Sequence, residues 1–203
     1  MTSEYVPTVS ELRQAYVEAS GASMAQESYY AEQVAEFERG IARIKAEAFC
    51  QASGLPTVAD DSGLCVEALG GAPGVYSARY CGRHGDDPAN NRKLLQNLAN
   101  VPEGARGAKF VSAVCVLLPG GACHIFLGEC PGRIGFAEQG TNGFGYDPLF
   151  IPDRVGLPDG STAPNAQGRT YAQLADGEKD AISHRGRAMA AMAEALPQIL
   201  AGA

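Results

Sequence analysis

The apolar run from Val111 to Leu118 is the feature of this sequence that most constrains the fold. Nearly all of its side chains are apolar, so both faces of a strand built from it would have to be covered, as they are in the centre of a sheet. We therefore predict a central strand over Ala108–Leu118. Pro119-Gly-Gly121 predicts a turn after it, and His124-Ile-Phe-Leu127 predicts the strand that returns as a hairpin.

Three further segments have the periodicity of helices. Apolar residues at three- and four-residue steps predict an amphipathic helix from about Glu32 to Ser53, which Gly54 and Pro56 end. The expected apolar stripe of this helix consists of Val34, Phe37, Ile41, Ile44 and Ala48. Asn90–Ala99 predicts a second helix, and Ser183 is placed to cap a last one.

The chain as a whole indicates one domain of the α/β class. No repeat, low-complexity tract or linker divides residues 1–203, and a hydrophobic content of 45% supplies a sizeable core. The segment Ile151–Arg169 is rich in proline and glycine, which predicts a long loop or a flap over a cleft.

The charge balance excludes two classes of partner. Sixteen Lys and Arg against 23 Asp and Glu give a net charge of −7, so no general positive field draws the chain onto nucleic acid or an anionic membrane. A polyanionic ligand must be bound by local groups. The first residues do not form a signal peptide, and no apolar run approaches the roughly 18 residues of a spanning helix. We expect a soluble, cytoplasmic protein.

The six cysteines do not have the spacing of zinc ligands, because no two of them lie closer than seven residues. Cys115 falls inside the apolar run, where a reduced cysteine behaves as a small buried hydrophobic residue. We predict reduced structural thiols, as is usual in the cytosol.

Adjacent carboxylates at Asp60 and Asp61 are the first candidate for chemistry. The run Leu55–Ala59 predicts a buried strand, and Asp60-Asp-Ser-Gly63 after it predicts a polar turn. Mg²⁺ binds one or two carboxylates and completes its shell with water and phosphate oxygens, so the pair suits this ion. Asp-Asp-Ser-Gly is equally good turn chemistry, and spacing alone does not separate the two interpretations.

Two other clusters have polar or aromatic groups where a ligand would meet them. Asn142-Gly-Phe-Gly-Tyr-Asp147 would bring backbone close to a flat ligand and offer a ring for stacking, although a glycine-rich turn with two core aromatics is the simpler interpretation on its own. Ile182-Ser-His-Arg-Gly186 combines a helix start with an imidazole and a guanidinium, which suits carbonyl or phosphate oxygens. A capped helix with solvated charges explains it equally well.

Two common signatures of hydrolases are absent. The chain has no Gly-x-Ser-x-Gly elbow, and Ser183 is adjacent to His184 in sequence, which weakens the case for a serine hydrolase. It also has no Walker loop for phosphate.

Five blocks taken together closely resemble the inosine triphosphate pyrophosphatase family, whose members are also called XTP/dITP diphosphatases. The blocks are Ala59-Asp-Asp-Ser-Gly-Leu64, Ala68-Leu-Gly-Gly-Ala-Pro-Gly-Val-Tyr-Ser-Ala-Arg-Tyr80, Asn90-Asn-Arg-Lys-Leu-Leu95, Asn142-Gly-Phe-Gly-Tyr-Asp-Pro148 and Ile182-Ser-His-Arg-Gly186. The resemblance extends from about Glu32 to the C-terminus. It implies an elongated α/β fold with a central mixed sheet, a nucleotide cleft between two lobes, and a homodimer. It also implies Mg²⁺-dependent hydrolysis of ITP, dITP and XTP to the monophosphate and pyrophosphate.

The resemblance also implies roles for particular residues. Asp61 matches the catalytic acid that holds the metal and prepares the attacking water, and Glu32 falls near a second acidic metal position. The residues that match substrate-binding positions are Lys45 near the phosphates, Ser62 beside the catalytic acid, Phe144, Gly145, Tyr146 and Asp147 in the base-binding loop, and Lys179, His184 and Arg185 around the base and sugar.

The sequence departs from the family pattern near its N-terminus. The stretch Thr2–Glu11 stands where the family has a phosphate-binding loop with Asn and Lys, and both are missing. Either residues have been lost from the start or this loop has been rebuilt. Gly40-Ile41 replaces a Glu-Asn pair of the family, and Val155–Arg169 is longer than usual.

Two functions therefore follow as hypotheses. The first is an active pyrophosphatase that removes deaminated purine nucleotides from the nucleotide pool, and we favour it because Asp61 and the base-binding blocks are intact. The alternative is a catalytically weak or inactive nucleotide-binding protein of the same fold, which the altered phosphate loop would explain.

Overall fold

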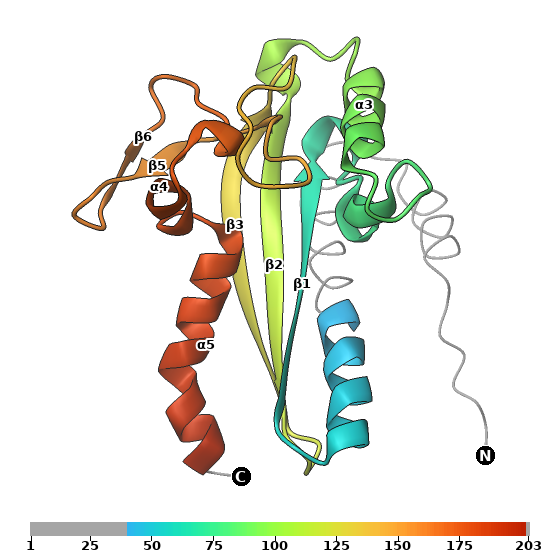
Figure 1. Ribbon diagram of the computed structural model, residues 1–203, viewed down its shortest axis with the longest axis vertical. Helices are drawn as coiled ribbons and strands as arrows, with labels where there is room; N and C mark the ends of the chain where they lie inside the picture. The colour runs from blue at the N-terminus through green and yellow to red at the C-terminus, as the bar shows by residue number, and fades with distance from the viewer. Residues whose placement is uncertain (1–39, 202–203) are drawn as a thin grey trace, which may run out of the picture.

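A computed structural model describes residues 40–201. Its centre is an antiparallel sheet in the order β1-β2-β3-β4, formed by Thr57–Val66, Gly107–Leu117, Cys123–Ile134 and Phe150–Pro152. The long strands β1 to β3 run side by side along the molecule (Figure 1). β2 lies between β1 and β3, so the prediction of a central strand is confirmed. All the described pairs are antiparallel, so the parallel part of the expected mixed sheet is not among them.

One face of the sheet is covered by the helix over residues 40–53, which ends at Gly54 with a φ of +69°. Figure 1 shows this helix beside the lower half of the strands. Its buried side chains are Ala42, Ala46 and Cys50, which pack on Ala113 and Cys115 of β2. Small residues at four-residue steps let the helix lie close to the sheet.

The expected apolar stripe of that helix is wrong for the described part. Ile44 is 64% exposed, and Ala48 is exposed too, while Ile41 is half-buried. The periodicity correctly predicted a helix, but the face that packs on the sheet is the one that carries Ala42, Ala46 and Cys50, not the one that carries Ile44. Val34, Phe37 and Glu32 lie outside the described residues.

The opposite face is covered by α5, His184–Ala201. Ala188 and Met192 of α5 pack on Val114 and Val116 of β2. The helix begins as predicted, because Ser183 Oγ accepts a hydrogen bond from Gly186 N at 3.0 Å. The sheet is therefore sandwiched between two helices over its lower half (Figure 1).

A second, larger core lies at the other end of the sheet, around Leu64, Phe110 and Phe150. It includes Leu94 of α3, the helix Asp87–Asn97, which starts three residues before the predicted Asn90. Asp86 explains this earlier start, because its Oδ1 caps the helix by accepting from Ala89 N at 3.1 Å. Short helical segments complete this end: η1 Glu67–Leu69, η2 Gly74–Arg79, η3 Glu103–Ala105, η4 Tyr171–Gln173 and α4 Asp176–Asp180.

The segment Ile151–Arg169 is not the long loop or flap that its composition predicted. It completes β4 and forms a hairpin of β5, Arg154–Gly156, and β6, Thr162–Pro164. The Arg154 side chain holds the two strands together by donating to Thr162 Oγ1 at 2.8 Å and to Thr162 O at 2.7 Å. Its prolines fall at strand ends and in the turn, where no ladder hydrogen bond is lost.

Two chain-wide features complete the description. All six cysteines are free thiols, in line with the prediction, and Cys115 and Cys123 approach to 3.4 Å between their Sγ atoms. Over residues 40–201, no helix is long and apolar enough to cross a membrane.

Candidate active site

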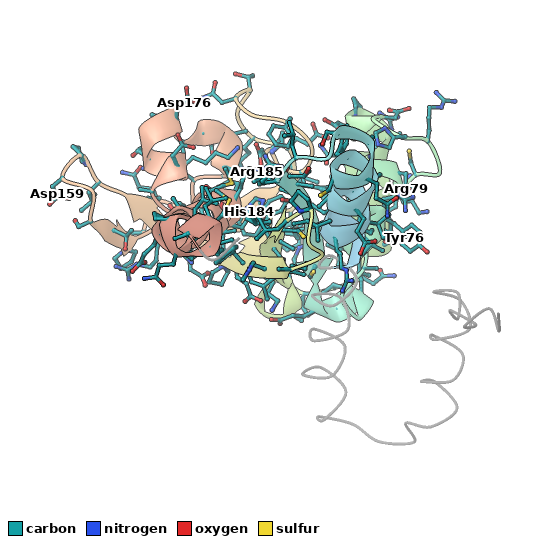
Figure 2. The ribbon with its side chains drawn as sticks, turned by 90° about the horizontal axis from the view of Figure 1, so that it is seen from below. Tyr76, Arg79, Asp159, Asp176, His184 and Arg185 are labelled. Carbon is teal, nitrogen blue, oxygen red and sulfur yellow. The ribbon has the colours of Figure 1, made fainter. Side chains whose placement is uncertain are left out.

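A cavity of about 570 Å³ opens where β1, the helix over residues 40–53, α5 and the loop over residues 142–147 meet. Its wall includes every described residue to which the family resemblance gave a site role: Lys45, Asp61, Ser62, Phe144, Gly145, Tyr146, Asp147, Lys179, His184 and Arg185. In Figure 2 His184 and Arg185 lie near the centre of the molecule, whereas Asp159, in the turn of the β5–β6 hairpin, lies at its margin. The structure therefore brings these residues together, while their individual roles stay predictions.

Asp60 and Asp61 do not form the polar turn that the sequence predicted, because both lie inside β1. Successive side chains of a strand point to opposite faces, and the two aspartates follow this rule. Asp61 receives a hydrogen bond from Lys45 Nζ at 2.5 Å, on the face of the helix over residues 40–53. Asp60 receives one from Arg185 Nε at 2.8 Å, on the α5 face. The adjacent carboxylates therefore serve different sides of the cavity.

Each cationic side chain of the cavity wall is paired with a carboxylate. Besides the pairs Lys45–Asp61 and Arg185–Asp60, Lys179 Nζ donates to Asp147 Oδ2 at 2.6 Å. Three cationic side chains face five aspartates on this wall, so the wall is acidic by two formal charges. A highly anionic ligand needs additional positive charge to bind here.

The loop over residues 142–147 is held in place by its own acid. Asp147 is buried, and its Oδ2 accepts from Phe144 N at 3.0 Å as well as from Lys179. Gly143 has a φ of +78°, and a Cβ there would collide with the Asp147 carboxylate. The ring of Phe144 is 66% exposed at the cavity, with Lys179 Nζ 5.3 Å from its centroid. The loop thus offers an aromatic face to a ligand.

The imidazole of His184 is neutral at physiological pH. Its ring stacks on Phe110 at 4.8 Å between centroids. Burial, together with the smaller effects of the charges of Arg185 and Lys179, lowers the pKa of His184 to about 3, and the opposing effect of Asp60 is smaller still. A neutral imidazole has one donor and one acceptor nitrogen, so His184 offers the cavity directional hydrogen bonds without a charge.

Two buried polar atoms of the wall have no hydrogen-bond partner within residues 40–201. They are Ser62 Oγ and His184 Nδ1. A buried polar atom without a partner costs about 1–3 kcal/mol.

The residues present fit a Mg²⁺ ion held mainly by its ligand and by water. Asp61 presents a carboxylate to the cavity, and Lys45 occupies only one of its oxygens. In the described part of the chain, no cluster of three His, Cys, Asp or Glu side chains forms a complete metal cage. Mg²⁺ characteristically uses one or two carboxylates together with substrate phosphates. Glu32, the other metal candidate, and Thr2–Glu11 lie outside the described residues.

Comparison with known proteins identifies the family. The Ham1 family model matches residues 7–195. The chain belongs to the Ham1 family. This confirms the resemblance that the five sequence blocks indicated.

Curated relatives of this Ham1 chain are named dITP/XTP pyrophosphatases. The relative from Nocardia farcinica is 51% identical over 162 residues, which are 80% of this chain and 72% of that protein. The relative from Mycolicibacterium paratuberculosis is 50% identical over 162 residues, which are 80% of this chain and 73% of that protein.

Solved structures support the same placement. A nucleoside-triphosphatase / dITP/XTP pyrophosphatase from Mycobacterium abscessus matches with a TM-score of 0.63 and 41% identity, over 95% of this chain and 79% of that one. The Ham1 protein of Staphylococcus aureus matches with a TM-score of 0.66 and 39% identity, over 77% of this chain and 74% of that one. The Ham1 chain therefore has the α/β fold of these solved structures.

Several wall residues of the Ham1 chain had no role among those that the family resemblance implied. Asp60, which the sequence indicated only as half of a carboxylate pair, orients Arg185. Phe110 supports the His184 ring and Asp87 contacts the loop over residues 142–147, and both act through contacts with residues distant in sequence. The remaining additional wall residues are Gly63, Ser77, Ala78, Asp180, Ser183, Gly186 and Met189.

Proposed function

We propose that this protein hydrolyses deaminated purine nucleoside triphosphates, namely ITP, dITP and XTP, to the monophosphate and pyrophosphate. The observation that carries the proposal is the single cavity that combines an aspartate–lysine pair, an aromatic loop and two unpartnered polar atoms. The names of the relatives support the same reaction. In the cell this activity would remove damaged nucleotides from the cytoplasmic pool.

The phosphate end of the substrate lies against Asp61 and Lys45. Water attacks the α-phosphorus and gives up a proton to the Asp61 carboxylate. The bond from this phosphorus to the oxygen that bridges it to the β-phosphorus breaks, and pyrophosphate leaves with that oxygen. Asp61 orients the attacking water and accepts a hydrogen bond from it, while Lys45 holds the Asp61 carboxylate and contributes positive charge beside the phosphates. A Mg²⁺ ion held by Asp61 would neutralise phosphate charge, which the acidic wall requires.

The base end lies between Phe144 and the start of α5. Hypoxanthine and xanthine have an acceptor oxygen at C6, where adenine has a donor amino group. Arg185 has only donors, and Asp60 occupies its Nε, so the remaining guanidinium hydrogens are available to that oxygen. Phe144 stacks on any purine and contributes affinity without selecting the base. Guanine has the same C6 oxygen, so contacts at the C2 position of the base must exclude it.

The test is pyrophosphate release from ITP, dITP, XTP, ATP and GTP in the presence of Mg²⁺. We expect faster release from the first three nucleotides, and no release after chelation of the metal with EDTA. Undiminished release in EDTA would contradict the metal requirement. No release from ITP, together with retained ITP binding, would contradict the enzyme and support the alternative of an inactive nucleotide-binding protein. The intact Asp61–Lys45 pair favours the enzyme.

Replacement of Arg185 tests the selection of the base. In Arg185→Ala we expect the ratio of kcat/KM for ITP over ATP to fall by about tenfold or more, because a charge-assisted hydrogen bond to the C6 oxygen is lost. Steady-state kinetics with both nucleotides measures the ratio. Arg187→Ala is the matched control, since Arg187 belongs to the same helix turn but donates to Glu129 O at 2.6 Å, away from the cavity wall. An unchanged ratio in Arg185→Ala would refute this role.

We also propose that the protein acts as a homodimer, as the resemblance implies. Large apolar side chains are exposed on the helix over residues 40–53 and just after it, including Ile44, Phe49 and Leu55. Such a group is typical of surfaces that bind another protein. Sedimentation of the full chain would measure the oligomeric state, and a monomer at micromolar concentration would contradict the proposal.

A further inference from the structure

The backbone N–H and C=O of Gly145 are both hydrogen-bonded to side chains from one turn of α3. Asp87 Oδ2 accepts from Gly145 N at 2.8 Å, and Asn91 Nδ2 donates to Gly145 O at 3.1 Å. Asp87 and Asn91 are four residues apart, so both side chains leave the same face of the helix. α3 therefore binds both the backbone N–H and the backbone C=O of one residue, Gly145, in the loop over residues 142–147.

The amide of Asn91 makes this contact at a cost to stability. Asn91 is buried, and its Oδ1 has no hydrogen-bond partner within the described residues. The bond to Gly145 O is the hydrogen bond that the structure gives to its side chain. An apolar residue of similar size would avoid an unpartnered buried oxygen. The hydrogen bond to Gly145 O is the stabilising contact that a polar side chain at position 91 makes possible.

The two hydrogen bonds supplement the contacts on either side of Gly145. On the N-terminal side, Asp147 Oδ2 holds Phe144 N at 3.0 Å, and on the C-terminal side Tyr146 OH donates to Ser77 O at 2.9 Å. Gly145 itself has a φ of +60°, and a Cβ placed on it would meet no atom within 4 Å. Phe144 O accepts a hydrogen bond from Asp147 N at 3.2 Å. Without Asp87 and Asn91, the N–H and C=O of Gly145 would lose the partners that the structure gives them, and this residue would be loosely held.

We propose that Asp87 and Asn91 are positioning residues that fix the Phe144 ring for stacking on the purine base. The proposal rests on the proposed function, since it assigns the support of the base-binding loop to α3. The two side chains act through the Gly145 peptide, which is joined directly to Phe144. α3 thereby fixes the orientation of the Phe144 ring before the nucleotide binds. This preorganisation lowers the entropic cost of binding.

This role predicts a particular kinetic signature. Stacking on Phe144 does not distinguish one purine from another, so a looser loop weakens the binding of all purine nucleotides similarly. Neither Asp61 nor Lys45 is hydrogen-bonded to Gly145, so we expect the chemical step to be unaffected. Loss of the two hydrogen bonds should raise KM for ITP and ATP by a similar factor and leave kcat and the ITP-to-ATP ratio close to wild type.

The variants Asp87→Ala and Asn91→Ala each remove one of the two hydrogen bonds. Asp87→Asn is the conservative rescue, because an amide oxygen still accepts from Gly145 N. Asn97→Ala is the matched control, since Asn97 also belongs to α3 but donates to Tyr80 OH at 2.7 Å, six residues beyond Asn91. Backbone amide hydrogen exchange measures how often the loop over residues 142–147 opens in the free protein. Calorimetry with non-hydrolysable α,β-methylene ITP measures the Kd without turnover.

We expect exchange over residues 142–147 to accelerate by roughly tenfold in both alanine variants, and the Kd of the analogue to rise by a similar factor. Asn97→Ala should match wild type in both measurements. Asp87→Asn should match wild type in hydrogen exchange, and its Kd should not rise, because the acceptor for Gly145 N is kept while one negative charge is removed from the acidic wall. Unchanged exchange in the alanine variants would overturn the proposal, and so would faster exchange with an unchanged Kd. Both measurements are independent of hydrolysis, so absence of pyrophosphate release by the wild-type protein would contradict the proposed function alone.

Discussion

Asp61→Asn is expected to lower kcat/KM for ITP by about a thousandfold or more while the fold is retained. The substitution keeps the shape of the side chain and removes its charge. Lys45 then loses the carboxylate that orients it, and a metal ion loses its anionic ligand within the described residues. The side chain is only partly buried, so the amide does not disturb a core. Pyrophosphate release gives the rate, and thermal unfolding gives the stability.

Asp60→Asn is the matched control for this experiment. It makes the same change one residue earlier, but on the opposite face of β1, where the carboxylate orients Arg185. We expect Asp60→Asn to keep most of kcat and to reduce the preference for ITP over ATP. A loss of kcat/KM in Asp60→Asn as large as in Asp61→Asn would contradict the separate roles of the two aspartates. If Asp61→Asn retains a tenth of wild-type activity, the proposed catalytic role of Asp61 is contradicted.

These two aspartates also show where sequence-based prediction succeeds and where it ends. The residue types in the Asp60–Gly63 block indicated a candidate site, and the structure places all four residues on the cavity wall, while their roles stay predictions. Its conformation was not predictable, because the same four residues suit a turn and β1 is stabilised by pairing with the distant β2. Strand pairing is a tertiary contact, and it decided which carboxylate faces Lys45.

The elements were predictable where the local pattern and the tertiary contacts agree. The apolar run of β2 needs cover on both faces and obtains it, and Ser183 caps α5 as its position indicated. The helix over residues 40–53 was predicted with the wrong buried face, because close packing on the sheet favours Ala42 and Ala46 over Ile44. The hairpin of β5 and β6 was missed because proline and glycine mark strand ends as well as loops.

The largest expected effect outside the cavity comes from Gly128→Ala. Gly128 of β3 faces the first turn of α5, and a Cβ on it would lie 2.0 Å from His184 O and 2.6 Å from Ala188 N. Both are backbone atoms, so the clash is relieved only when α5 moves away from the sheet. In register, Gly128 is paired with Ser112 of β2, and Ser112 with Ser62 of β1. This row of small residues gives α5 room to begin close to the sheet.

Moving the start of α5 has two consequences. The variant should lose about 1–3 kcal/mol of unfolding free energy, as is typical of overpacking. It should also lose activity toward ITP by on the order of 100-fold, because a displacement near 1 Å takes His184 and Arg185 out of position. Urea unfolding and pyrophosphate release measure the two effects. Gly120→Ala is the control, because a Cβ there meets no atom within 4 Å and its backbone is not left-handed. If Gly128→Ala folds with wild-type stability and activity, close packing of α5 on β3 does not position the site.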